Sequence, residues 1–207
     1  MNDLAVMVSK RNLLKAQRMH ERVLRLSRRI LGEGDLLRIA SMGNLASTLF
    51  EQGNLAGGRK LLEKALKVSK KVFGIDHPNT LRAMSNVSVA MSRQGDLTSA
   101  RHLDQEVLEL RMKVLGPDHP DTLRSMNNLA ETMRLQGELD KARTLHEKTL
   151  EIRRRVLGVE HPETLHSMEI LRITLKQQNM TNSKRKSKRE DALISRRSIK
   201  KRSTKIV

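Results

Sequence analysis

The chain has 207 residues, enough for one or two globular domains, and 41 Lys plus Arg against 23 Asp plus Glu give it a formal net charge of +18. It contains no cysteine, which excludes disulfides, thiolate zinc sites and a cysteine nucleophile. Two Phe are the only aromatic residues and eleven residues are Met, so the core must be built from aliphatic side chains and Met, a composition typical of helices.

The first predicted element is an unpaired helix over about residues 12–30. Its apolar residues recur at helical spacing, at Leu13, Ala16, Met19, Val23, Leu26 and Ile30. No long apolar stretch of the secretory-signal kind precedes it. The longest uncharged stretch of the chain, residues 39–50, is far shorter than the roughly 20 residues that span a bilayer. We therefore expect a soluble, cytoplasmic protein.

Three complete repeats follow, over residues 31–72, 73–114 and 115–156, and a half repeat covers residues 157–178. The second and third repeats are identical at 20 of 42 positions. Look-alike segments at a fixed period indicate a solenoid of stacked helical units. Residues 1–180 are therefore predicted to form one array. The array is left with an unpaired helix at each end, and we expect both end helices to expose apolar stripes because no polar capping helix is evident.

Each repeat is predicted to be a hairpin of two helices. In the first helix, small and apolar residues fall on one stripe at Met84, Val87, Ser88 and Met91, and one repeat later at Met126, Leu129, Ala130 and Met133. A Gln-Gly pair follows this helix and supplies the glycine that a tight reversal needs. A His-Pro pair places proline in the first turn of the next repeat.

On these residues, the chain resembles the tetratricopeptide repeat in its long, kinesin-light-chain-like form. The resemblance covers about residues 13–178 and depends on the pieces DHPDTL, NNLA and QGELDKAR. Similar arrays also occur in bacterial multidomain signalling proteins. The resemblance implies an all-α, right-handed superhelical solenoid of antiparallel hairpins that binds other proteins. Where the family often has aromatic residues, this chain has Met or Leu.

A second stripe on the first helices is the candidate binding surface. In the family that the chain resembles, first helices line a concave groove, and an asparagine on this stripe often clamps the backbone of a bound peptide. A carboxamide both donates and accepts hydrogen bonds, and arginine adds charge-assisted bonds to a carboxylate. The candidate peptide-binding residues are Asn44, Asn86, Asn128, Arg82, Arg124, Arg93 and Arg134.

Two other interpretations of these residues remain open. The asparagines could instead bond a neighbouring helix and fix the stacking of repeats, and the arginines could form an ordinary solvated helix face. Four arginines against Glu51 and Glu131 nevertheless favour an acidic or C-terminal peptide.

Residues 181–207 form a basic tail with 11 Lys plus Arg and two acidic residues. Because such a segment offers little apolar surface for burial, we expect it to be disordered when free. It could be a solvated tail, a nuclear-import-like signal, or a segment that attracts nucleic acid or anionic lipid. Its basic cluster comprises Lys184, Arg185, Lys186, Lys188, Arg189, Arg196, Arg197, Lys200, Lys201 and Arg202.

No catalytic residue, cofactor or metal site is predicted. The candidate ligands His77, His119 and His161 recur at the repeat period, and equivalent places on successive repeats do not converge within the roughly 2.0–2.1 Å that zinc requires. The segment 53–60 has Arg59 where a phosphate-binding loop needs Lys.

The sequence therefore predicts a noncatalytic interaction scaffold that binds a protein or peptide, acidic by preference, in the groove. Self-association through the exposed end helices is a further expectation. The alternative function is nucleic-acid association through the tail, with the repeats as a spacer.

Overall fold

The computed structural model describes the backbone of residues 2–203 and the side chains of residues 12–187. The regular secondary structure of residues 2–203 consists of eight helices, which short turns separate. The chain forms two units, residues 1–136 and 137–207. The first unit contains α1 (Asn2–Ile30), α2 (Leu36–Glu51), α3 (Leu55–Phe73), α4 (Pro78–Arg93), α5 (Leu97–Leu115) and α6 (Pro120–Leu135). The second contains α7 (Leu139–Leu157) and α8 (Pro162–Ser203).

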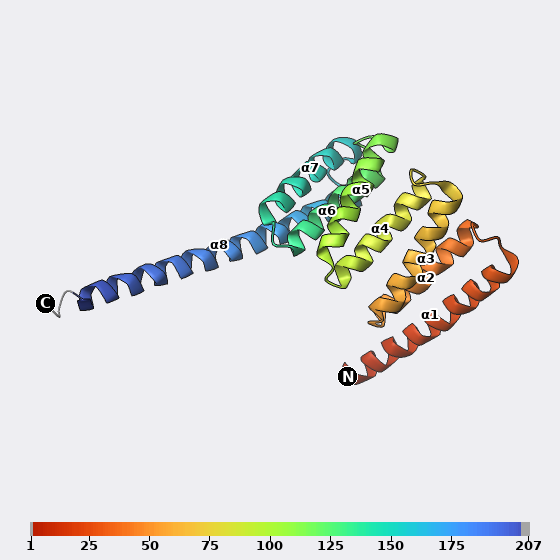
Figure 1. The fold of residues 1–207 in the computed structure, drawn as a ribbon, viewed down its shortest axis with the longest axis horizontal. Coiled ribbons are helices and arrows are strands. Elements are labelled where there is room, and N and C mark those ends of the chain that lie inside the picture. The colour runs from red at the N-terminus through yellow and green to blue at the C-terminus, as the bar shows by residue number, and fades with distance from the viewer. Residues whose placement is uncertain (1, 204–207) are drawn as a thin grey trace. The chain divides into compact units, whose positions relative to one another are not determined.

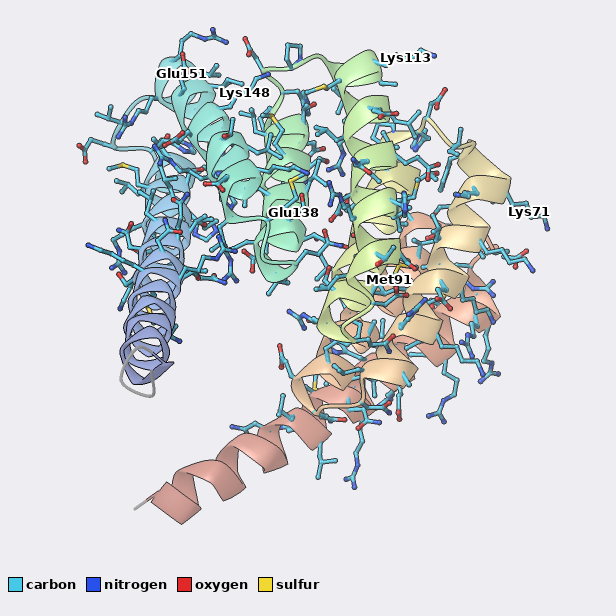
Figure 2. All side chains as sticks on the ribbon, turned by 60° about the vertical axis from the view of Figure 1, so that its left-hand side comes forward. Lys71, Met91, Lys113, Glu138, Lys148 and Glu151 are labelled. Atoms are coloured by element: carbon cyan, nitrogen blue, oxygen red, sulfur yellow. The ribbon has the colours of Figure 1, made fainter. Side chains whose placement is uncertain are left out.

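In the first unit each helix packs on the next one in the chain, from α1 to α6, and α4 also contacts α6 (Figure 1). The apolar stripes explain this order, because each helix buries residues against both of its neighbours. Met42 of α2 packs in one cluster with Leu24 of α1 and Val68 of α3. Met84 of α4 packs with Val107 of α5. Charged side chains such as Lys71 and Lys113 point away from the helices (Figure 2).

The His-Pro pairs begin the first helices as N-caps. The Nδ1 atom of His77 accepts a hydrogen bond from the N–H of Asn79 at 3.1 Å, and His119 does the same for Asp121 at 3.1 Å. Asp35 occupies the corresponding place before α2, where its Oδ1 accepts from the N–H of Leu37 at 2.8 Å. The 42-residue recurrence of histidine is thus explained by helix capping, in which a side-chain acceptor satisfies an otherwise free backbone donor.

The turn glutamines connect neighbouring hairpins. The Nε2 of Gln52, at the end of α2, donates to the carbonyl of Leu13 in α1 at 3.2 Å. Gln136, at the end of α6, donates in the same way to the carbonyl of Leu97 in α5 at 3.2 Å and accepts from Arg101 at 3.1 Å. Each of these two bonds gives a backbone carbonyl of the preceding second helix an additional donor and ties that helix to the end of the next first helix. The sequence pattern predicts a role in the turn for the adjacent glycine, and the structure adds this role for the glutamine.

A buried arginine joins α5 to α6. The Arg111 side chain is 1% exposed, and its guanidinium donates to the carbonyl of Asp121 at 3.0 Å and to the Ser125 hydroxyl at 2.6 Å. Burial lowers the pKa of Arg111 below its ordinary value. In the second unit Arg153 makes the same bonds from α7 to α8, to the carbonyl of Glu163 at 3.0 Å and the hydroxyl of Ser167 at 2.6 Å.

The last helix is longer than predicted. The sequence pattern places its end near residue 178, with disorder from residue 181, whereas α8 continues to Ser203. The extension contains no Gly or Pro that would end a helix, and its Lys, Arg, Ala and Leu residues have high helix propensity. The side chains of residues 182–187 on this extension are exposed.

Both end helices expose apolar residues, as predicted. On α1 these include Met19, Val23 and Leu26. On α8, Leu165 and Met168 are exposed, but a charged pair lies beside them: Arg172 donates to Glu169 at 2.6 and 2.7 Å. The corresponding places in α4 and α6 hold buried small or amide residues, namely Ser85, Ser88, Asn127 and Ala130. The exposed apolar surface of α8 thus has a charged pair within it, at places that are buried and uncharged in α4 and α6.

Candidate functional site: a groove along the first helices

The predicted binding stripe lines a hollow between α2 and α4. This first hollow has a volume of about 360 Å³. Asn44 from α2 and Arg82, Asn86 and Arg93 from α4 line it. The small residues Ala40, Gly43, Ser47 and Ala83 form much of its wall. Small side chains leave room for a ligand backbone to approach the helices, so the hollow suits an extended segment.

A second hollow continues the groove from α4 to α6, with a volume of about 380 Å³. Val89 and Arg93 of α4 line both hollows, and Asn128 lines the second from α6. Glu131 also lines it, as the stripe predicts, whereas Glu51 lines neither hollow.

The three asparagines are available to a ligand. The side chains of Asn44 and Asn86 are exposed and that of Asn128 is half-buried. Within residues 12–187, none of the three carboxamides makes a hydrogen bond. The interpretation in which they bond a neighbouring helix and fix repeat stacking therefore has no support from the described contacts. Their role in peptide binding stays a prediction.

The four candidate arginines divide into two pairs. Arg124 is ion-paired with Asp121, and Arg134 is held by both carboxylate oxygens of Glu131 at 2.6 and 2.7 Å. Hydrogen bonding to Glu131 raises the pKa of Arg134. Neither of these two arginines lines the two hollows.

Arg82 and Arg93 differ because neither has a carboxylate partner among the described residues. Arg82 donates to the Asn79 amide oxygen at 3.3 Å. The Arg93 guanidinium lies over the Phe50 ring, 5.3 Å from its centroid, which orients the cation without neutralising it. The described residues that line the first hollow include no carboxylate, so its charge is positive.

A buried carboxylate borders the second hollow. Asp104 of α5 is 3% exposed, and its Oδ2 accepts a hydrogen bond from the Thr132 hydroxyl at 2.8 Å. Desolvation raises the pKa of Asp104, although hydrogen bonds from Ser88 and Thr132 act in the opposite direction. The sequence pattern did not identify this residue as part of the groove.

The raised pKa of Asp104 predicts a pH dependence of stability. Since the folded protein holds this proton more tightly than the unfolded chain, the Asp104 contribution to stability is largest below its unfolded pKa and is lost as the pH rises through the folded value. We expect Asp104→Asn to remove this loss, so that the variant gains stability relative to the wild type as the pH is raised. Urea titrations at several pH values, from below the ordinary carboxyl pKa to the alkaline side of neutrality, would measure it. A constant difference between the two proteins would contradict the prediction.

The remaining candidates divide between capping residues and the tail. His161 accepts from the N–H of Glu163 at 3.2 Å, as its two repeat equivalents do in their caps. Lys184, Arg185 and Lys186 are exposed on α8. The side chains of the other tail residues, Lys188, Arg189, Arg196, Arg197, Lys200, Lys201 and Arg202, lie outside the described residues. Binding through the tail stays a prediction.

A family model of the tetratricopeptide repeat matches the chain at residues 38–111, 89–154 and 127–182. These overlapping matches run from residue 38 to residue 182 and so cover more than half of the 207 residues. The chain belongs to the tetratricopeptide repeat family. This match confirms the predicted all-α repeat fold and the resemblance to the tetratricopeptide repeat. Such repeats are typical of noncatalytic scaffolds for protein–protein interaction.

Solved structures give the same fold for this tetratricopeptide repeat protein. A Podosopora anserina protein named for the kinesin light chain, with nearly identical TPR-like repeats, matches with a TM-score of 0.67 at 24% identity, over 87% of this chain and 86% of that one. Its Q17M variant matches with a TM-score of 0.68 at the same identity and coverage. BtubC (BKLC) from P. vanneervenii matches with a TM-score of 0.67 at 19% identity, over 81% of this chain and 67% of that one.

No curated protein matches the chain. None of the helices in the described part is both long and apolar enough to cross a membrane. Nor do the described residues bring together three His, Cys, Asp or Glu side chains that could hold a metal ion.

Proposed function

We propose that this tetratricopeptide repeat protein is a noncatalytic scaffold that binds an extended, acidic segment of a partner protein in the groove along α2, α4 and α6. The observation that carries the proposal is the combination found in the first hollow. Two carboxamides without internal partners and two arginines without carboxylate partners, among the described residues, line it together. The carboxamides suit the peptide backbone and the arginines suit acidic side chains or a C-terminal carboxylate.

The acidic preference depends on Arg82 and Arg93. Arg124 and Arg134 already have carboxylate partners on their own helix, so a ligand would have to compete with Asp121 and Glu131 for them. Binding of an acidic segment should therefore be centred on the first hollow. The second hollow, which Asp104 and Glu131 line, suits polar or donor-bearing residues of the same segment.

The experiment is a fluorescence-anisotropy titration of matched acidic and basic peptide libraries against the full chain. We expect acidic peptides to bind better, and Asn44→Ala combined with Asn86→Ala to weaken binding about thirtyfold, since each lost hydrogen bond is worth about 1 kcal/mol and 1.4 kcal/mol is tenfold. Arg82→Gln combined with Arg93→Gln should remove the acidic preference.

Two matched controls separate the groove from other surfaces. Arg124→Gln removes an arginine that Asp121 already holds outside the hollows, and Asn182→Ala removes an exposed asparagine on α8. Both should bind as the wild type does. Equal binding by the groove variants and the wild type would refute the assignment. Loss of binding only when the chain is cut after Met180 would instead favour the basic tail.

A further inference from the structure

The outer face of α1 carries an apolar stripe that the repeat pattern marks as an interface. Met19, Val23 and Leu26 form this α1 stripe, with exposures of 59%, 51% and 44%. One repeat later the same places hold Leu61, Ala65 and Val68 of α3, of which Ala65 is 4% and Val68 5% exposed.

The residues that cover this face in the next repeat come from the first helix of the hairpin. Leu61, Ala65 and Val68 pack in one cluster with Ile39 and Met42 of α2, among others. Val107, at the place of Ala65 one further repeat along, packs against Leu81 and Met84 of α4. The register therefore assigns the α1 stripe to contact with a first helix.

No first helix covers the stripe within the described chain. Internal second helices begin after a Gln-Gly turn, such as residues 52–54, which brings the first helix back alongside. The corresponding residues of α1, 10–12, are helical, and α1 continues without reversal to Asn2 (Figure 1). Its one extensive helix contact is with α2, on the side where Leu24 and Ser27 are buried.

Positive charges beside the α1 stripe indicate which kind of helix would bind there. Lys15, Arg22 and Arg29 are spaced seven residues apart and form a row directly beside the stripe, on the side away from α2; we call them the basic row. All three side chains are exposed, and none has an acidic partner among the described residues. A row over 14 residues is about 21 Å long, close to the roughly 24 Å of a 16-residue first helix.

A second copy of this chain is a poor match for the basic row. Its own first helices carry no surplus of acid: α4 has Arg82 and Arg93 but no acidic residue, and α2 has one acid and one arginine. The other end helix, α8, presents the charged pair Glu169–Arg172 at the interface register. The chain's net charge of +18 adds to the repulsion.

We propose that the α1 stripe binds an acidic amphipathic helix of a partner protein, which takes the place of the first helix that internal repeats fold onto their second helix. Apolar residues of that helix cover Met19, Val23 and Leu26, and its acidic residues face the basic row. None of these α1 residues lines the two hollows, so the surface is separate from the groove.

The test uses the full chain and two labelled 16-residue peptides. Both have leucine at the places of the apolar α2 residues Ile39, Met42 and Leu45; one has glutamate and the other lysine at the places exposed in α2. We expect the glutamate peptide to bind at least about tenfold more tightly than the lysine peptide, with an affinity that falls as salt is raised. Circular dichroism would verify that each variant remains folded.

Variants of α1 then locate the binding. Arg22→Glu combined with Arg29→Glu should weaken binding of the glutamate peptide about tenfold and strengthen binding of the lysine peptide, since each change replaces an attraction between exposed charges with a repulsion. Val23→Glu should abolish binding. The matched control Arg28→Glu alters an exposed arginine on the side of α1 opposite the stripe and should leave the affinity unchanged.

Three results would overturn the proposal. The first is that each peptide binds the basic-row variant, Arg22→Glu combined with Arg29→Glu, with the same affinity as it binds the wild type. The second is loss of binding in the groove variant Asn44→Ala, Asn86→Ala, which would place the peptide in the groove. The third is a doubled molar mass in sedimentation equilibrium that Val23→Glu abolishes, which would assign the stripe to a second copy. Failure of the groove proposal leaves these measurements unaffected.

Discussion

Replacing Arg111 with Ala is expected to lower the free energy of unfolding by about 3 kcal/mol, because it removes a buried cation that satisfies two acceptors on another helix. The change empties the space of a side chain that is 1% exposed and leaves the Ser125 hydroxyl without its donor from α5. Urea unfolding followed by circular dichroism would measure the loss. Lys113→Ala, on the exposed side of the same helix, is the control and should change stability by less than about 0.5 kcal/mol.

Two further variants test the cause of the Arg111 effect. Arg111→Met keeps most of the volume and removes the cost of burying a charge, so it should be less harmful than Ala. Combining Arg111→Ala with Ser125→Ala should cost less than the sum of the two single changes, because the two residues share a hydrogen bond. Additive losses would show that the bond between α5 and α6 contributes little.

Replacing Gly58 with Ala is expected to destabilise the protein by about 2 kcal/mol, although Ala is the better helix former by about 1 kcal/mol. A Cβ atom on Gly58 would lie 2.5 Å from Cε1 of Phe50 and 2.8 Å from two other ring atoms. The ring would have to move, and with it the Arg93 guanidinium that lies over it. The affinity for an acidic peptide should therefore fall together with the melting temperature.

The same chain supplies the control for Gly58. Gly43 lies within α2, and no neighbouring atom comes within 4 Å of the place that an added Cβ would occupy, so Gly43→Ala should stabilise by up to about 1 kcal/mol. One repeat along, Ser92 and Ala100 stand at the places of Phe50 and Gly58. Phe50→Ser combined with Gly58→Ala should therefore recover part of the loss. If Gly58→Ala and Gly43→Ala shift the melting temperature in the same direction, the ring does not determine the choice of glycine.

The sequence was sufficient to predict the helices and much of the groove, because both depend on patterns that repeat every 42 residues. The stripe of Arg82, Asn86, Val89 and Arg93 could be assigned to one surface from helical spacing, and all four residues line the first hollow. The spacing did not show that Arg124 is ion-paired whereas Arg82 has no carboxylate partner among the described residues. The difference is one residue three positions earlier, Asn79 in one repeat and Asp121 in the next, and only the acid forms an ion pair.

The polar contacts between helices were not predicted, because hydrophobic periodicity says nothing about which polar residues are buried. Arg111 and Asp104 both lie at core positions that a search for apolar residues passes over. A signal was nevertheless present. Arg111 and Arg153 are one repeat apart, as are the serines to which they donate, Ser125 and Ser167.

The end of α8 was missed for a different reason. Disorder was inferred from a lack of apolar surface, which bears on tertiary packing. The backbone conformation of that segment depends instead on local helix propensity, which is high because the segment contains no Gly or Pro. The segment is therefore helical to Ser203.

The pairs that join each second helix to the following first helix differ along the chain. His20 bonds Thr48 at 2.9 Å, Leu62 packs with Ala90, and Asp104 accepts from Thr132 at 2.8 Å. Deleting residues 73–114 would join α3 directly to α6 and set Leu62 against Thr132, whose buried hydroxyl would lose its acceptor. The repeats of this array therefore cannot be exchanged or deleted freely, even though they have the same length. Each second helix contacts the following first helix through a different pair of residues, so a new neighbour would not match it.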